Sequence, residues 1–154
     1  MKVLISYFYQ IRFFKSNYIP ISTAVWPPKY FFHNGQQFKD KNGVWNGIQA
    51  FEFMPDESCE GLCQGPQNCM KKEENCAFLS TYKAQLDKLD FNSIMERFKI
   101  LGNKVKEVEN FEEEPICVLI VFETPTNPCS ERGPLKKWFA EHGYELEEFR
   151  KELI

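Results

Sequence analysis

The sequence predicts an α/β fold: a single domain over residues 1–154, in which a mostly parallel sheet is flanked by helices and carries a Cys-rich loop insertion at about residues 55–77. Apolar and aromatic runs alternate with segments of helical periodicity along the chain. The nearly continuous apolar run at residues 116–122 is typical of a strand that is covered on both faces. A chain of 154 residues with 43% hydrophobic content can bury its own core without dividing into two domains.

The first third of the chain predicts two strands. Residues 3–9 and 19–26 are rich in β-branched and aromatic side chains, and two consecutive prolines stop the second run. Glycines and asparagines make residues 29–47 an irregular excursion, which ends in a short strand expected at 47–53. The strands at 3–9 and 116–122 are expected to be parallel, and either adjacent or one strand apart.

Helical spacing begins after the Cys-rich segment. Apolar residues recur at helical intervals from Ala77, and Asp90 is placed to cap a second helix that Gly102 would stop. Apolar residues around Trp138 predict a third helix, and residues 146–153 predict a short charged one.

The charge of the chain disfavours non-specific nucleic-acid binding. The formal net charge is −3 and the isoelectric point is about 5.5, so a phosphate backbone would not be attracted to the chain as a whole. Nucleic acid stays a second expected partner class, because basic residues are interleaved with the aromatic residues of the first third. No run approaches the roughly 20 apolar residues that span a bilayer, so a cytoplasmic protein with no membrane partner is expected.

A candidate anion site lies where the last apolar run passes through a loop into the third predicted helix. The first turn of a helix offers free backbone N–H groups and a partial positive charge. Cys129, Ser130 and Arg132 fall in that turn, and a guanidinium can grip a phosphate or carboxylate at two points. Ser6 and Tyr7 would lie nearby if the first and last strands are parallel neighbours. A small anionic ligand, such as a nucleotide, is therefore expected.

Cys129 and Glu123 are the candidate catalytic residues. The helix dipole and Arg132 would lower the pKa of the Cys129 thiol and make it a nucleophile; the alternative is a small residue that caps and packs the turn. Glu123, at the end of an apolar strand, is either an acid or base or a solvated strand end. Arg132 has its own alternative, an ion pair with Glu131 or Glu123. Anion binding without covalent chemistry is the favoured interpretation.

Cys59, Cys63, Cys69 and Cys76 form a candidate metal site. Their spacing lets a short loop fold four thiolates round one ion, as tetrahedral structural zinc requires. Such a density of cysteines in a cytosolic chain favours metal over disulfides, so zinc is the expected cofactor. Disulfides and unliganded thiols are the alternatives, and His33 could replace one thiolate.

Three segments of the chain carry a resemblance to a known family: VLISYFYQIRFF, IPISTAVWPPKYF and VLIVFETPTNPCSERGPLKKWF. They resemble domain-of-unknown-function family 488, which has a strand ending in Ser-Tyr, a Trp-Pro-Pro-Lys-like turn and a Cys-His-Arg helix start. The resemblance implies an α/β fold and a nucleotide- or nucleic-acid-related setting in bacteria or their phages. The family's His is replaced here by Ser130 and Glu131. The matching residues are Ser6, Tyr7, Trp26, Lys29, Glu123, Cys129 and Arg132.

Three functions follow as hypotheses. The first is a small enzyme acting on a nucleotide, nucleoside or modified base, with Ser6, Tyr7, Lys29, Ser130 and Arg132 binding the ligand. The second is a non-catalytic nucleotide or nucleic-acid binding module that uses the same pocket. The third is a host-interaction protein whose zinc loop supports a binding surface.

Overall fold

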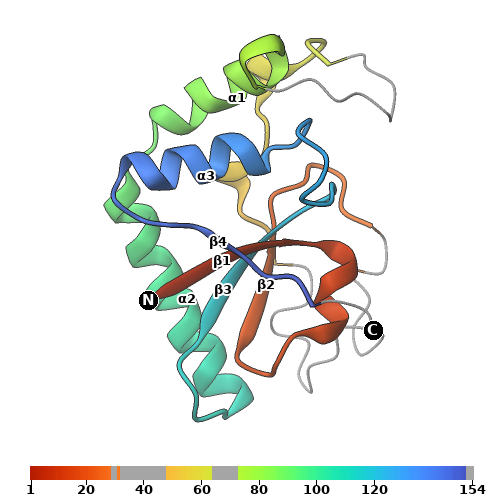
Figure 1. Cartoon of the computed structure of the whole chain (residues 1–154). Coiled ribbons are helices and arrows are strands. Elements are labelled where there is room, and N and C mark those ends of the chain that lie inside the picture. Colours follow the sequence, from red (N-terminus) through yellow and green to blue (C-terminus); the bar gives the residue numbers. More distant parts are fainter. Residues whose placement is uncertain (29–30, 32–47, 64–72, 152–154) are drawn as a thin grey trace.

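The computed structural model describes residues 1–28, 31, 48–63 and 73–151. Within them a four-stranded sheet has the strand order β2-β3-β1-β4, and every pairing is parallel (Figure 1). The predicted α/β fold with a mostly parallel sheet is therefore confirmed. The strands are β1 (Lys2–Tyr7), β2 (Tyr18–Ser22), β3 (Ile116–Val121) and β4 (Glu147–Glu148).

β3 is the central strand that connects β1 and β2, because it pairs with both of them. The register aligns Tyr7 with Val121 on one side and Ser22 with Ile120 on the other. Residues 117–121 are buried, as an apolar strand covered on both faces should be. The predicted parallel and adjacent placement of the first strand and the run 116–122 is confirmed. The carboxyl ends of β1, β2 and β3 consequently meet at one edge of the sheet.

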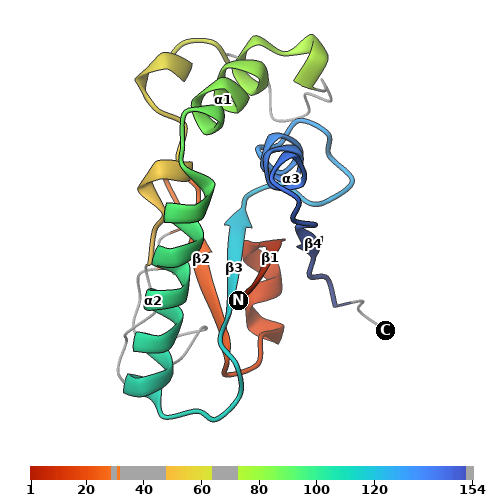
Figure 2. The same cartoon turned by 90° about the vertical axis from the view of Figure 1, so that its left-hand side faces the viewer.

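Different elements cover the two faces of the sheet (Figure 2). Odd-numbered strand residues, such as Ile5 and Leu119, pack with side chains of the helices in the larger core. Even-numbered residues, such as Leu4 and Val118, pack with the 3-10 helix η1 in a smaller core. This alternation is the two-residue period of a strand. The covering elements are α1 (Ala77–Asp87), α2 (Phe91–Glu109), α3 (Arg132–Glu141) and η1 (Phe8–Phe13).

The three predicted helices are present, but α2 is longer than expected. It passes through Gly102 and ends at Asn110, which adopts the left-handed conformation with φ 57°. The prediction that Gly102 stops the helix is wrong, and its backbone instead packs closely on the loop before β3. A Cβ atom at this position would lie 3.2 Å from the Cβ of Pro115. None of the described helices is long and apolar enough to cross a membrane.

Two further segments differ from their predicted structure. In the stretch expected to be a strand at 47–53, Gln49 makes an isolated parallel bridge to Ser22, and the 3-10 helix η3 (Phe51–Phe53) follows. Of the helix expected at 146–153, the structure describes residues 146–151, which form no helix and contain the short strand β4; after it the Phe149 backbone N–H donates to the Ile5 carbonyl at 2.8 Å. Gln49 and residues 147–149 thus pair with the two opposite edges of the sheet, at β2 and β1.

Candidate functional site

A cavity of about 690 Å³ lies where β2 and β3 end. Its walls come from segments far apart in the sequence: the loop after β2, Phe122 after β3, residues 55–63, Phe78 in the first turn of α1, and Glu131 just before α3. Open parallel sheets bind ligands in this position, beyond the carboxyl ends of their strands. The cavity is therefore the first place to look for a functional site in the described chain.

Gln85 of α1 fixes one wall of this cavity. Its Nε2 donates to the Met54 carbonyl at 2.6 Å and to the Glu52 carbonyl at 3.3 Å, while its Oε1 accepts from the Asp56 backbone N–H at 2.9 Å. The hydroxyl of Tyr82, one helical turn earlier, donates to the Phe53 carbonyl. Two buried polar side chains of α1 thus hold residues 52–56, which have little regular structure of their own.

Gln85→Leu should lower the free energy of unfolding by about 2 to 3 kcal/mol, because three hydrogen bonds are lost and buried backbone groups are left unpaired. Urea denaturation would measure the change. Gln85→Glu is the isosteric variant: as a carboxylate it keeps an acceptor for the Asp56 N–H but turns an oxygen toward the two carbonyls, so a loss at least as large as that of Gln85→Leu is expected. Equal stability of wild type and Gln85→Leu would mean that other contacts hold this wall.

Among the described residues that line the cavity, Glu131 has the carboxyl group with the most strongly shifted pKa. Burial raises the pKa of its carboxyl from 4.5 to about 7, and the neighbouring charge of Glu123 raises it as well, while Arg132 acts in the opposite direction. The carboxyl can therefore either donate or accept a proton near neutral pH. Sequence reasoning did not select Glu131 as catalytic; the available signal was its place where the resembled family pattern has a His.

The groups around Glu131 are also partly withdrawn from water. Glu123, the predicted acid or base, is half-buried, and its Oε1 has no hydrogen-bond partner among the described residues. Burial, aided by the charge of Asp56, raises the pKa of the Cys59 thiol, which lines the same cavity. A thiol with a raised pKa stays protonated at neutral pH and is a poor nucleophile. The chemistry of this wall is therefore that of carboxyl groups rather than of a thiolate.

Arg132 is buried and forms an ion pair that the sequence did not predict. Its Nε lies 2.7 Å from Glu148 Oε1 and its Nη2 lies 3.3 Å from Glu148 Oε2, so the two groups meet in a bidentate pair. The guanidinium carbon is 6.0 Å from the centre of the Tyr7 ring. Nη1 is buried without a hydrogen-bond partner among the described residues. The bidentate face of the guanidinium predicted to bind an anion is thus engaged by Glu148 of β4.

The backbone N–H groups before and within the first turn of α3 also have internal partners. Those of Cys129 and Arg132 donate to the side chains of Asn127 and Ser130, at 2.9 and 3.1 Å. The Gly133 N–H donates to the Ser130 carbonyl at 3.3 Å, and position 134 is a proline, which has no N–H. Ser130 therefore acts as a cap for this turn. The predicted anion site stays a prediction.

The other predicted ligand-binding residues have structural contacts. Ser6 is fully buried, and its Oγ donates to the Phe149 carbonyl at 2.7 Å. The Tyr7 hydroxyl accepts a hydrogen bond from Gln10 Nε2 at 3.1 Å. Parallel pairing does bring Ser6 and Tyr7 to the end of β3, as expected. Cys129 is half-buried, and Lys29 lies outside the described residues.

The predicted zinc site is described only in part. Cys59 is buried, Cys63 is exposed and Cys76 is half-buried, and all three are free thiols, whereas Cys69 and His33 lie outside the described residues. Among the side chains that the structure describes, no three His, Cys, Asp or Glu residues are grouped so that they could hold a metal. Cys59 and Cys63 do line the same cavity. Structural zinc stays a prediction.

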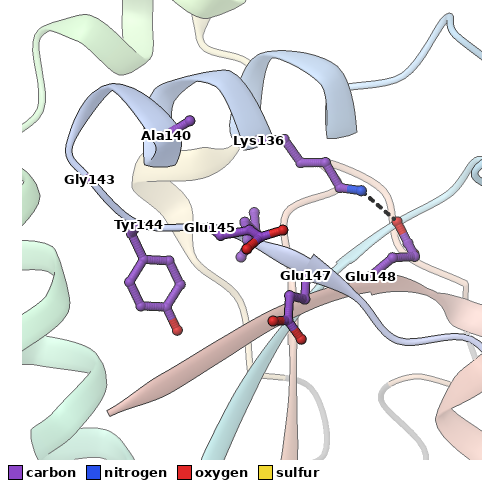
Figure 3. Close-up of a pocket in the computed structure, with 8 residues that line it drawn as sticks. Lys136, Ala140, Gly143, Tyr144, Glu145, Glu147 and Glu148 are labelled. Carbon is purple, nitrogen blue, oxygen red and sulfur yellow. Dashed lines mark ion pairs between the residues drawn. The ribbon is translucent and has the colours of Figure 1, made fainter.

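A second cavity, of about 770 Å³, lies on the surface between α3 and β4 (Figure 3). Lys136 extends from α3, and its Nζ lies 3.5 Å from Glu148 Oε1. Glu145 and Glu147 line the same hollow, together with Tyr144. None of the residues that the sequence selected for a site lines this cavity, and its described ammonium group is already paired. It is a weaker candidate than the cavity at the strand ends.

Comparisons of the chain with protein-family models, with curated proteins and with solved structures found no match. The resemblance to family 488 therefore stays a prediction. The function is inferred from the geometry of the cavity beyond β2 and β3.

Proposed function

We propose that the cavity beyond β2 and β3 is the active site of a small enzyme acting on a nucleoside or modified base, with Glu131 as its general acid and base. The observation that carries this proposal is the position of Glu131: the residue lines a cavity at the carboxyl edge of a parallel sheet, and its largely buried carboxyl has a pKa of about 7. A catalytic acid or base is most effective when its pKa is close to the working pH.

The apolar wall of the cavity supports a planar ring as the ligand. Trp26 is 84% exposed and Phe122 is 49% exposed, although both are large hydrophobic residues at its wall. Phe78 lines the same space from α1. Stacking of a base on an aromatic side chain contributes about 1 to 3 kcal/mol. The carboxylates beside these rings would accept hydrogen bonds from amino and imino groups of a nitrogen heterocycle.

The chemistry supported here is proton transfer to or from a ring nitrogen or its substituent. With a nucleoside, protonated Glu131 would donate its proton to a ring nitrogen as the bond from that nitrogen to the sugar carbon breaks. Water would add to the sugar carbon, and the Glu131 carboxylate would take up the proton that this water loses. Thiolate chemistry from Cys59 is disfavoured by the raised pKa of that thiol. The alternative is a non-catalytic binding module, which would use the same walls without turnover.

Replacing Glu131 with Gln should abolish proton transfer while leaving the ring-binding walls in place. With nucleosides and modified bases as a substrate panel, mass spectrometry should detect conversion by the wild type and a loss of about 100-fold or more in the variant. Binding of the same compounds should persist, because the aromatic walls are unchanged. Binding by both proteins without conversion by either would favour the non-catalytic module.

The pH dependence of the free energy of unfolding tests whether the Glu131 carboxyl has a raised pKa in the folded protein. Its folded-state pKa is above the ordinary value, so the native protein binds more protons than the unfolded chain between pH 4.5 and about 7. The contribution of this group to the free energy of unfolding therefore falls as pH rises through that window. In Glu131→Gln this part of the slope should vanish. An unchanged slope would mean that Glu131 titrates as an ordinary surface carboxylate.

A further inference from the structure

We propose that the cavity beyond β2 and β3 selects a ring compound that carries a protonated amine and no phosphate. This inference rests on the proposed function for the position of the site, and it reverses the ligand charge expected from the sequence. The observation that supports it is a cavity whose described lining contains both aromatic residues and carboxyl groups. Among its described lining residues are Asp56, Glu57, Glu60 and Glu131, and none is a lysine, arginine or histidine.

The buried basic side chains of the described chain are engaged elsewhere. Arg132 pairs with Glu148 at 2.7 Å, on the side of α3 that faces β4. Lys83 lies 2.7 Å from both Asp87 and Glu141, where it joins α1 to α3. These two are the described basic residues with buried side chains. Neither lines the cavity, so an anion entering it would meet no described counter-charge at the wall.

The aromatic residues at the wall suit a cation as well as a ring. Trp26 is largely exposed and Phe122 is half-exposed. A positive group over the face of an aromatic ring is attracted by the negative charge of that face, most strongly over an indole. Glu57 and Glu60 flank the buried Cys59 and are themselves exposed, so they are free to approach an amine at the rim. Aromatic faces and carboxylates thus both favour a positively charged ligand.

Asp56 adds a fixed acceptor to this wall. Its Oδ1 accepts hydrogen bonds from the Ser58 backbone N–H, at 2.9 Å, and from the Ser58 hydroxyl. Its own backbone N–H is held by Gln85. A phosphate brought to these residues would face the hydrogen-bonded carboxylate of Asp56 and the exposed carboxylates of Glu57 and Glu60, and like charges at short range repel. The cavity should therefore distinguish a ring compound with a protonated aliphatic amine from the corresponding phosphorylated compound.

A matched pair of probes tests the sign of the charge: tryptamine and indole-3-propionate share the ring and the two-carbon linker and differ in the terminal group. Titration of the full chain, followed by NMR chemical shifts, should show tryptamine binding roughly tenfold more tightly, or about 1.4 kcal/mol. Glu57→Gln and Glu60→Gln should each weaken tryptamine binding by about 2- to 5-fold. Glu147→Gln, an exposed carboxylate at the other cavity, is the matched control and should leave it unchanged.

Each outcome decides between the two proposals. Tryptamine preference that falls in Glu57→Gln and Glu60→Gln, and weakens with added salt, supports the inference. Equal or tighter binding of indole-3-propionate would overturn the charge inference and leave the cavity as a ligand site. A tryptamine preference insensitive to both variants would also overturn it, because the selecting charge would lie elsewhere. Failure of both probes to bind would overturn this inference alone, because the proposed function is decided separately by conversion of nucleosides and modified bases in wild type and Glu131→Gln.

Discussion

Glu148→Ala should lower the free energy of unfolding by about 3 to 5 kcal/mol, because it leaves the buried charge of Arg132 without its partner. The side chains of Arg132 and Glu148 are only 7% and 18% exposed, and two nitrogens of the guanidinium bind the carboxylate. The third nitrogen of the guanidinium, Nη1, lacks a hydrogen-bond partner within the described chain. Urea denaturation at neutral pH would measure the loss.

Two variants control this prediction. Glu147→Ala removes the exposed carboxylate next in sequence and should change stability by no more than about 0.5 kcal/mol. Arg132→Met with Glu148→Leu removes both charges and should recover most of the stability, because no buried charge is then left unpaired. If Glu148→Ala is as stable as the wild type, Arg132 must have another counter-ion. A bound anion at Nη1 would then become the leading explanation.

Phe53→Ala should destabilise the protein by about 3 to 5 kcal/mol, the range for removal of a buried aromatic ring. Phe53 is fully buried, and its ring centre lies 5.9 Å from that of Phe98 and 5.7 Å from that of Trp138. It therefore packs η3 against α2 and α3 at once. Thermal or urea unfolding, monitored by far-UV circular dichroism, would report the effect.

The same 3-10 helix offers the control for Phe53. Phe51 lies two residues earlier and is 72% exposed, so Phe51→Ala should change stability by no more than about 0.5 kcal/mol. Similar losses in the two variants would contradict the packing described for η3. A large loss in Phe53→Ala with a small one in Phe51→Ala would show that burial, rather than the aromatic residue type, determines the cost.

The fold was predictable where local pattern and tertiary structure agree. The apolar run of β3 indicated a strand covered on both faces, and its parallel pairing with β1 followed from the α/β pattern. The end of α2 was predicted wrongly at Gly102, because a glycine can either end a helix or allow close packing within one. Sequence spacing alone does not separate these two roles. The helix predicted at residues 146–153 was wrong, because pairing of β4 with β1 overrode the helical preference of this Glu-rich segment.

The site was less predictable because its walls depend on contacts between distant residues. The strand-to-helix segment was predicted to hold an anion site, but Arg132, on which that prediction centred, is not among the described lining residues of the cavity. Its partner Glu148 lies in a segment expected to be helical. Glu131, one position earlier, lines the cavity instead. Its raised pKa depends on burial by residues far along the chain. Likewise, no local pattern indicates that Gln85 would hold residues 52–56 from a helix.

The strand order has a consequence for how the chain is made. β1 and β2 are both synthesised early, but they do not pair with each other. Both pair with β3, which is synthesised much later. At the usual 5 to 20 residues per second, the ribosome needs on the order of 5 to 20 seconds to reach the central strand after β2 has been made. During that interval two apolar strands with open edges leave the exit tunnel without their partner. The edges of β1 and β2 that pair with β3 are therefore expected to stay unpaired until β3 has been made, and unpaired edges are the part of an incomplete sheet most prone to aggregation.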